Sequence, residues 1–305
     1  MADILVVGSI NMDMVITTHA WARPGETVRG SEFMLSPGGK GANQAVAAAK
    51  LGARTALNAR IGDDLFGKNL IESAAGYGVD VLGVPVTPGV SSGVAVITLC
   101  NGENTIIIDA GANARLFPAD IVFKTPPKAL IVQLEIPYET VYAALKAGRS
   151  AGSITILNPA PAPASDVVLP EDFYACIDVL TPNETECQAI TGICVDDEAS
   201  AFEALDALRA LGVGRPVITL GEKGAAFWDG VRNRLMPAVP AKAIDTTAAG
   251  DTFTAALGVA LAEGAAMEDA IDFARHAAAI TVSRMGAQRA TPERAEVEAL
   301  MKGKG

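Results

Sequence analysis

The segment Asp3-Ile4-Leu5-Val6-Val7-Gly8-Ser9 is a short apolar run that ends in small residues, which is the pattern of a buried strand. The pattern recurs further along the chain, at residues 129–134, 154–158, 179–181 and 216–220. Helical stretches separate these runs, for example at residues 138–151 and 199–211. Because strands and helices alternate at this spacing, we predict an α/β fold in which a mainly parallel sheet has helices on both faces.

Length and composition favour one large core. The chain has 305 residues, of which 50% are hydrophobic and only 5% aromatic. Small aliphatic side chains suit helices packed on a parallel sheet, so we expect a single domain over residues 1–305. The mean hydropathy of +0.30 requires no membrane, because no apolar run approaches the roughly 20 residues that span a bilayer. The segment Met1-Ala2-Asp3-Ile4 has no basic region before its apolar stretch, and we expect a cytoplasmic protein.

The charge balance and the metal-binding side chains exclude some classes of function. The chain carries 24 Lys and Arg against 35 Asp and Glu, a net charge of −11. This balance argues against nucleic acid, although local backbone N–H groups and Mg²⁺ can still hold one nucleotide. The four cysteines have no CxxC spacing and the chain has only two histidines, so we expect reduced thiols and no zinc site.

Two segments of the N-terminal third break the alternation of strands and helices. They are residues 12–36 and residues 94–109. In the second, two β-prone runs flank a turn at Asn101-Gly102-Glu103-Asn104, which predicts a β-hairpin. We expect both segments to form a small β-sheet that acts as a lid on the main domain. A static extension of the sheet edge is the alternative.

A motif near the C-terminus, Asp245-Thr246-Thr247-Ala248-Ala249-Gly250-Asp251-Thr252-Phe253, precedes a helical run over residues 254–263. A helix start offers unpaired N–H donors and a partial positive charge, and Ala248, Ala249 and Gly250 have little bulk to keep a phosphate away. We therefore predict an anion hole at Ala248–Gly250 with Asp251 beside the bound anion. An ordinary acidic first turn that stabilises the helix dipole is the alternative.

A second motif is Ser36-Pro37-Gly38-Gly39-Lys40-Gly41-Ala42-Asn43-Gln44-Ala45, which leads into an Ala-rich helix ending near Leu51. Its glycines permit close backbone approach to a ligand, and Lys40 and Asn43 lie about one turn apart, where both can face a polyol. It is not a Walker A loop. A better lookalike at residues 62–69 has Asn69 in place of the Mg²⁺-binding hydroxyl, so we interpret it as a capping turn before a helix over residues 65–75.

The third motif, Gly8-Ser9-Ile10-Asn11-Met12-Asp13, follows the first predicted strand. Ligands of open α/β sheets bind beyond the carboxyl ends of the strands. Alternation along an extended chain puts Asn11 and Asp13 on the same side, where both suit sugar hydroxyls. Turn chemistry is the alternative role of these two side chains.

These motifs belong to a set of seven that follow in order along nearly the whole chain. The set is Gly8-Ser9-Ile10-Asn11-Met12-Asp13, Pro24-Gly25-Glu26-Thr27, Gly38-Gly39-Lys40-Gly41-Ala42-Asn43-Gln44, Gln133-Leu134-Glu135, Asn158-Pro159-Ala160-Pro161, Thr181-Pro182-Asn183-Glu184 and Asp245 to Asp251. It resembles the ribokinase (PfkB carbohydrate kinase) family, which also holds fructokinases and adenosine kinase. The resemblance implies a ribokinase-like three-layer α/β/α sandwich with a mainly parallel sheet, a small β-sheet lid and a homodimer formed through that lid.

The resemblance also implies site residues, position by position. Ribose contacts would come from Asn11, Asp13, Gly39, Lys40, Asn43, Glu135 and Asp251. ATP contacts would come from Asn183, Thr219, Gly221, Gly224 and Gly250. Glu184 and Glu186 would support the Mg²⁺ network through water, with solvated carboxylates at a helix start as the alternative.

Ribokinases are activated by potassium, which implies a further set of oxygen donors in this chain. The set is the Asp245 carboxylate and the backbone carbonyls of Thr247, Thr281, Arg284, Gly286 and Ala290. One position departs from the family, which usually has Asn or His beside the adenine. This chain has Arg275-His276, so either residue is a candidate for the base contact, and His276 is equally interpreted as a buried structural histidine.

The combined interpretation is an ATP-dependent kinase that phosphorylates the 5-hydroxyl of D-ribose, with Asp251 as general base. A related kinase for deoxyribose, fructose or adenosine is the nearest alternative. A catalytically silent sugar-binding regulator is a second, which the intact Ala249-Gly250-Asp251 disfavours. A Rossmann-type dehydrogenase is a third, but Gly8 is not followed by GxGxxG.

Overall fold

The large sheet of the computed structural model is mainly parallel, and its order confirms the α/β prediction. The structure describes residues 2–121, 123, 125–164 and 167–303. In spatial order, the nine strands are β15 (Asn233–Met236), β14 (Ala225–Trp228), β13 (Arg215–Thr219), β12 (Val179–Leu180), β11 (Ile154–Asn158), β10 (Ala129–Gln133), β1 (Ile4–Val7), β4 (Thr55–Asn58) and β6 (Asp80–Gly83). The strands from β13 to β6 pair in parallel, whereas β14 and β15 form an antiparallel edge that the sequence did not predict.

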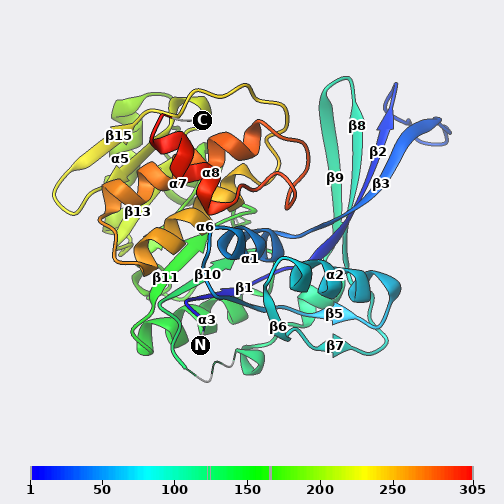
Figure 1. Ribbon diagram of the computed structural model, residues 1–305, viewed down its shortest axis with the longest axis horizontal. Coiled ribbons are helices and arrows are strands. Elements are labelled where there is room, and N and C mark those ends of the chain that lie inside the picture. Colours follow the sequence, from blue (N-terminus) through cyan, green and yellow to red (C-terminus); the bar gives the residue numbers. More distant parts are fainter. Residues whose placement is uncertain (1, 122, 124, 165–166, 304–305) are drawn as a thin grey trace.

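Helices cover both faces of this sheet, giving three layers (Figure 1). One layer is built on α1 (Lys40–Lys50), α2 (Leu65–Gly76), α6 (Ala249–Ala262), α7 (Met267–Val282) and α8 (Arg294–Met301). The opposite layer is α3 (Tyr138–Ser150), α4 (Glu184–Thr191) and α5 (Glu198–Ala210). Short connections add the 3₁₀ helices η1 (Gly111–Arg115), η2 (Pro118–Asp120), η3 (Tyr174–Cys176) and η4 (Gly221–Lys223), and the strand pair β5 (Ile61–Gly62) and β7 (Val86–Thr87).

The apolar run at the start of the chain shows why the sheet is buried on both faces. All four residues of β1 are buried. Ile4 and Val6 join the core beneath α1 and α6, while Leu5 and Val7 join the core beneath α3. Successive side chains of a strand point to opposite faces, so a continuous apolar strand requires an apolar layer on each side.

The two segments that break the alternation form a separate four-stranded sheet, as predicted. Its order is β3 (Gly30–Gly38), β2 (Asn11–Thr18), β8 (Gly93–Cys100) and β9 (Glu103–Asp109). This small sheet projects from the main body (Figure 1). The turn of the β8–β9 hairpin is shorter than predicted, because only Asn101 and Gly102 lie between the paired strands, both at positive φ (52° and 83°). Two adjacent left-handed residues in an Asn-Gly loop are the signature of a tight hairpin.

One helix boundary was predicted wrongly. The run expected from residue 254 is α6, which begins at Ala249. Ala248 takes a left-handed conformation (φ 59°) and ends the preceding loop, so Asp251 lies inside the first turn. The lookalike loop at residues 62–69 is the predicted capping turn, because the Asp64 side chain accepts a hydrogen bond from the Gly67 N–H at the start of α2.

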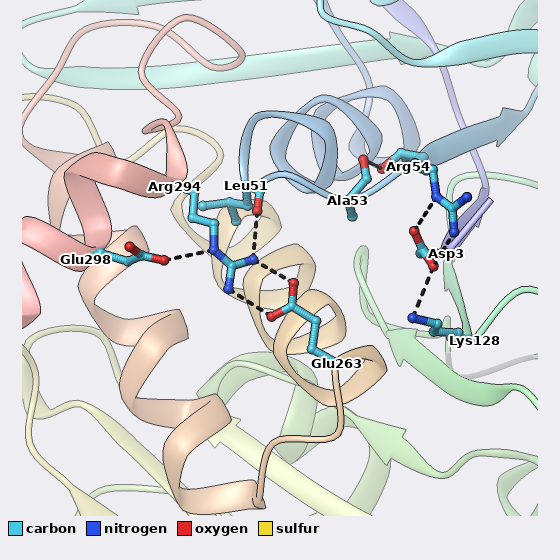
Figure 2. A network of polar contacts seen from close by, with 9 residues as sticks. Asp3, Leu51, Ala53, Arg54, Lys128, Glu263, Arg294 and Glu298 are labelled. Atoms are coloured by element: carbon cyan, nitrogen blue, oxygen red, sulfur yellow. Dashed lines mark hydrogen bonds and ion pairs between the residues drawn. The ribbon is translucent and has the colours of Figure 1, made fainter. Parts of the chain in front are cut away.

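Polar networks join the helices at the edge of the large sheet away from the predicted site (Figure 2). The Arg294 guanidinium donates to both carboxylate oxygens of Glu263 (2.6 and 2.8 Å), to Glu298 (2.9 Å) and to the Leu51 carbonyl (3.3 Å). Arg294 begins α8, and its partners Leu51 and Glu263 end α1 and α6. One side chain therefore holds three helix ends together.

We expect Arg294→Ala to lower the free energy of unfolding by about 2 kcal/mol, because a bidentate ion pair and a carbonyl contact are lost together. Urea unfolding at neutral pH measures this loss. Arg54→Ala is the matched control, since Arg54 is 66% exposed and its ion pair with Asp3 should contribute little to stability. Equal losses in the two variants would contradict the role given to Arg294.

No helix in the described part of the chain is both long and apolar enough to cross a membrane.

Candidate active site

The predicted site residues come together where the parallel strands end. The carboxyl ends of β1, β10, β11, β12 and β13 lie along one edge of the large sheet. Ser9, Glu135, Asn183 and Gly221 follow β1, β10, β12 and β13, and Asn158 is the last residue of β11. Residues far apart in the sequence thus meet at the edge where α/β proteins bind ligands.

The start of α6 has free N–H groups at this edge. The N–H groups of Gly250 and Asp251 have no protein acceptor within the described ranges, as expected of a first helical turn. The N–H of Ala249 donates to the Thr246 carbonyl at 3.3 Å. A Cβ added at Gly250 would meet nothing within 4 Å, so the approach is open. These donors, together with the helix dipole, suit an anion.

Asp251 is buried beside these donors, with 6% of its surface exposed. Its Oδ2 accepts a hydrogen bond from Asn43 Nδ2 at 3.1 Å, and its Oδ1 accepts one from Gln44 Nε2 at 2.9 Å. A carboxylate has about four acceptor positions, so lone pairs remain for a substrate hydroxyl. Asp251 and Asn43, both predicted from sequence, are in direct contact.

The Glu135 carboxylate ties the end of β10 to the start of α1. Its Oε2 accepts hydrogen bonds from the Ser9 hydroxyl at 2.5 Å and from the Lys40 backbone N–H at 3.1 Å. The Ser9 hydroxyl also accepts a hydrogen bond from the Gly41 N–H at 3.3 Å. Sequence reasoning did not assign a role to Ser9, although it stands in the first motif.

Asn11 and Gly39 are in contact through the backbone. Gly39 has a positive φ of 86°, and a Cβ there would lie 2.7 Å from the Asn11 backbone nitrogen. The Asn11 side chain is held by Asn113, whose Nδ2 donates to Asn11 Oδ1 at 2.7 Å. Asn113 was missed from sequence, because it lies in η1, beyond the hairpin that was taken as the whole of the second inserted segment.

Burial and the charges of Glu135 and Asp251 shift the pKa of both Asp13 and Lys40 at this edge. Burial raises the pKa of Asp13 to about 7, with further contributions from the charges of Glu135 and Asp251. Burial lowers the pKa of Lys40, but Asp251, Glu135 and Glu186 outweigh it and the net pKa is raised. The ammonium therefore stays charged among carboxylates. The Asp13 carboxylate has no hydrogen-bond partner among the described side chains and backbone groups, which leaves both oxygens for a ligand.

The raised pKa of Asp13 predicts a pH-dependent stability. An aspartate in the unfolded chain titrates near 3.8, so between about pH 4 and 7 the folded protein holds one more proton at Asp13 than the unfolded protein. Stability conferred by this position should fall as pH rises through that window and level off above it. Urea unfolding of the wild type and Asp13→Asn, at pH 5 and pH 8, measures the difference. A difference between the two proteins that is the same at both pH values would contradict the shift.

The predicted nucleotide residues lie on neighbouring strand ends. Asn183 caps α4, since its side chain accepts from the Glu186 N–H at 2.8 Å, and it forms an isolated bridge with Thr219. Gly221 begins η4 at a positive φ of 54° with open space around it. Gly224 closes that turn, where a Cβ would lie 2.0 Å from the Met236 carbonyl oxygen.

Arg275 and His276 follow each other on α7 but have different partners. The Arg275 guanidinium donates to Asp272 at 2.7 Å and to the Pro237 carbonyl at 2.9 Å, so it reaches the segment after β15. His276 Nδ1 lies 2.7 Å from the Asp272 carbonyl oxygen, one turn earlier on the same helix. The structure thus brings Arg275 to the loop that precedes Asp245 and keeps His276 bonded to its own helix.

Two loops meet around Asp245. Its Oδ1 accepts the Thr247 N–H at 2.9 Å and its Oδ2 accepts the Gly286 N–H at 2.8 Å. The Ile244 N–H donates to the Val282 carbonyl at 2.7 Å. These hydrogen bonds outweigh burial and lower the pKa of Asp245, which keeps the carboxylate ionised. One carboxylate beside neutral carbonyls is a donor set that fits a large monovalent cation.

The other predicted cation donors differ from one another in burial and in hydrogen-bond partners. Thr281 and Ala290 are fully buried. The Thr281 carbonyl accepts the Arg284 N–H at 3.1 Å, and the Arg284 side chain pairs with Glu296. Thr281 and Arg284 therefore form the turn just before Gly286, with the Thr281 carbonyl already accepting a hydrogen bond, whereas the Ala290 N–H donates to the Ala287 carbonyl at 3.2 Å.

Glu184 and Glu186 lie in the first turn of α4. Glu186 is 8% exposed, and its Oε2 accepts the Asn183 N–H at 2.9 Å. Burial raises its pKa, against the Asn183 hydrogen bond and the charge of Lys40. The described residues contain no group of three or more His, Cys, Asp or Glu that could hold a metal.

The site combines half-buried carboxylates that suit hydroxyl groups, a further carboxylate at a helix start, and adjacent backbone N–H donors. This combination defines a small-molecule kinase that acts on a polyhydroxy substrate. The chain belongs to the pfkB family of carbohydrate kinases, whose model matches residues 1–294.

Known proteins similar to this chain cover nearly all of it. The ribokinase of Haemophilus influenzae is 39% identical over 298 residues, 95% of each chain, and the deoxyribokinase of Salmonella typhi is 36% identical over 296 residues, also 95% of each. The Thermotoga maritima ribokinase structure has a TM-score of 0.89 at 38% identity, covering 99% of this chain and 100% of that one. The Arabidopsis thaliana ribokinase, complexed with ribose and ATP, has a TM-score of 0.90 at 33% identity and 99% coverage of both.

Proposed function

We propose that this protein transfers the γ-phosphoryl group of ATP to the 5-hydroxyl of D-ribose. The observation that carries the proposal is the position of Asp251, buried at the free N–H groups of α6 and hydrogen-bonded to Asn43. Ribokinases at up to 39% identity over nearly the whole chain, and a similar ribokinase that binds ribose and ATP, support the same activity.

Asp251 acts as the general base in this proposal. Its free lone pairs accept the proton of the 5-hydroxyl as that oxygen approaches the γ-phosphorus in line. The anion hole proposed at Ala248–Gly250 presents its free N–H group at Gly250, beside the free N–H of Asp251, to the charge that develops on the transferred group. Little proton transfer is needed early in a loose transition state, so positioning supplies most of the rate.

The sugar is held by the remaining polar groups of the same edge. A carboxylate accepts hydrogen bonds from two neighbouring hydroxyls, which suits Asp13 to a vicinal diol. Asn11, Asn43 and Glu135 supply further polar atoms, and the backbone at Gly39 permits close approach. For ATP, we assign contacts to Asn183, Thr219, Gly221, Gly224 and Gly250, with Arg275 beside the base.

A panel of acceptors tests the proposal. We expect ATP-dependent phosphorylation of ribose with kcat/KM at least about tenfold above that of 2-deoxyribose, because the lost hydroxyl leaves one Asp13 oxygen unpaired. ADP formation with ribose, 2-deoxyribose, fructose and adenosine measures this order. A preference for 2-deoxyribose would change the proposed substrate but not the proposed class of enzyme. No ADP formation with any acceptor would favour a catalytically silent sugar-binding regulator.

Two cations complete the proposed chemistry. Potassium would be held by the Asp245 carboxylate and the carbonyls near Thr247, Thr281, Arg284, Gly286 and Ala290, where it would fix the loop before α6. Mg²⁺ would neutralise phosphate charge, with Glu184 and Glu186 orienting its waters. The acceptor panel with potassium replaced by sodium, and with Mg²⁺ removed by a chelator, checks both assignments through the loss of rate.

We propose further that residues 1–305 form one kinase domain and that the small sheet is both lid and dimer interface. Its strands expose large apolar side chains, including Phe33 (59%), Ile106 (51%), Ile107 (72%) and Ile108 (52%). Ile106 and Ile108 point to one face of the small sheet and Ile107 to the other, and exposed apolar side chains of this size are typical of an interaction surface. A molar mass in solution of twice 31.3 kDa checks the dimer. Free thiols at all four cysteines suit the cytoplasm, which subcellular fractionation tests.

A further inference from the structure

Two hydrogen-bonded chains of buried side-chain carboxamides meet at the Asp251 carboxylate. In the first, Gln44 Nε2 donates to Asp251 Oδ1 at 2.9 Å, and Gln133 Nε2 donates to Gln44 Oε1 at 2.5 Å. Gln44 and Gln133 are both fully buried. The second N–H of Gln44 donates to Asn158 Oδ1 at 3.1 Å. The Gln44 amide is therefore held from three sides, by α6, β10 and β11.

The second chain reaches the other oxygen of the same carboxylate. Asn43 Nδ2 donates to Asp251 Oδ2 at 3.1 Å, and Gln288 Nε2 donates to Asn43 Oδ1 at 3.3 Å. Gln288 is 5% exposed and lies in the loop between α7 and α8. Each Asp251 oxygen thus receives one amide N–H that is itself held by a second amide.

The ionised carboxylate sets the direction of both chains. A carboxylate only accepts hydrogen bonds, so Gln44 and Asn43 must turn their nitrogens towards Asp251 and their oxygens away from it. The next amide in each chain must then present its nitrogen as well. This leaves the far oxygens, Gln133 Oε1 and Gln288 Oε1, as the ends of the chains. In the described part of the protein, these are two of the three buried side-chain polar atoms without a hydrogen-bond partner.

Unpaired buried acceptors destabilise a protein, and each one in a native structure calls for an explanation. Here they are the consequence of aligning four amide dipoles with their positive ends towards one charge. The end of the first chain packs closely against Gly8, because a Cβ added at Gly8 would lie 1.9 Å from Gln133 Oε1.

We propose that Gln44 and Gln288 are positioning residues for the phosphoryl transfer. Gln44 acts directly on Asp251, and Gln288 acts on it through Asn43; together they fix the plane of the carboxylate. The proposal rests on the role of Asp251 as general base. Neither glutamine touches the substrate or the transferred group in this account.

The test uses isosteric removal of each amide, Gln44→Met and Gln288→Met. We expect kcat to fall on the order of 10²-fold in Gln44→Met and about tenfold in Gln288→Met, with KM for ribose within about threefold, because a misplaced base slows the reaction more than it weakens binding. Thr254→Val is the matched control. It removes an equally buried hydrogen bond of α6, to the Thr181 hydroxyl at 3.0 Å, one turn beyond Asp251.

A structural role alone would not move the pH profile, so Gln44→Glu supplies a second readout. A carboxylate beside Asp251 disfavours the ionised state of the pair, and the acidic limb of the kcat profile should move to higher pH. An unmoved acidic limb would overturn the proposal even if Gln44→Met failed to fold.

Asp251→Asn separates this proposal from the proposed function. If Asp251→Asn turns over normally, the catalytic role itself is wrong. If Asp251→Asn is inactive while Gln44→Met and Gln288→Met keep kcat within threefold of the wild type, only the positioning role is overturned. Equal losses of kcat in Thr254→Val and Gln44→Met would also overturn it, because burial rather than contact with Asp251 would then explain the effect.

Discussion

Asp251→Ala is expected to lower kcat on the order of 10³-fold or more, since the variant loses the only carboxylate that lies both at the start of α6 and within reach of Asn43 in the described site. Sugar binding should weaken less, because Asp13, Asn11 and Glu135 still hold the other hydroxyls. Steady-state kinetics with ribose and ATP measures both quantities. Turnover close to that of the wild type would contradict the assignment of the base.

Asp251→Asn is the matched control for shape. The asparagine can keep the contact to one of the two amides, so the site should remain assembled while the base is lost. We expect a similar loss of kcat with a smaller change in KM than in Asp251→Ala. A large recovery of kcat in Asp251→Asn would indicate that the side chain serves only to hold α1 against α6.

Asp13→Ala is expected to lower kcat/KM for ribose on the order of 10²-fold or more. Hydrogen bonds to a charged acceptor contribute about 1.5–3 kcal/mol each, and the variant loses two of them. The loss should fall mainly on KM, because Asp13 binds the sugar in the ground state as well as in the transition state. Initial rates over a range of ribose concentrations measure the split.

The pH dependence of ribose binding is the control for this prediction. Because burial raises the pKa of Asp13 to about 7, the carboxylate that accepts two hydroxyls predominates only above that pH. KM for ribose should therefore fall as pH rises through about 7 in the wild type, and this trend should disappear in Asp13→Ala. Unchanged kcat/KM in the variant would remove Asp13 from the sugar site.

Local signals were sufficient for the parts of the fold that depend on neighbouring residues. The apolar run at Ile4–Val7 predicts a strand buried on both faces, and Asn101-Gly102 predicts a hairpin, because each pattern is read within a few residues. The lookalike loop at residues 62–69 was correctly interpreted as a capping turn, and the structure shows that Asp64 supplies the cap. In each case the residues of one short segment are sufficient to explain the local structure.

The features that were missed depend on contacts from elsewhere in the chain. The helical run was predicted from residue 254, although the motif before it was interpreted as a helix start, and α6 begins at Ala249 after Ala248 at positive φ. The antiparallel edge β14–β15 was also missed. Its strands are short and pair with each other and with β13, which a local pattern does not reveal.

The sequence pointed to residues that lie together in the structure, but not to the side chains that hold them in place. Position along strand ends, together with the family resemblance, gave Asp13, Asn43 and Asp251, which the structure gathers at one edge. Gln44 and Gln288 had no assigned role. A signal was present for Gln44, because two polar residues in succession interrupt an Ala-rich helix that is otherwise expected to be buried. Gln288 lies in a loop whose approach to Asn43 no local pattern indicates.

The most direct test of the central claim is to identify the carbon that receives the phosphoryl group and the residue on which the transfer depends. Uniformly ¹³C-labelled ribose would be incubated with ATP, Mg²⁺ and potassium, and ³¹P–¹³C coupling in the product recorded by NMR. We predict coupling consistent with phosphate on the 5-oxygen alone with the wild type, and no product over the same period with Asp251→Ala. Phosphate on any other oxygen, or equal product formation by the variant, would contradict the account.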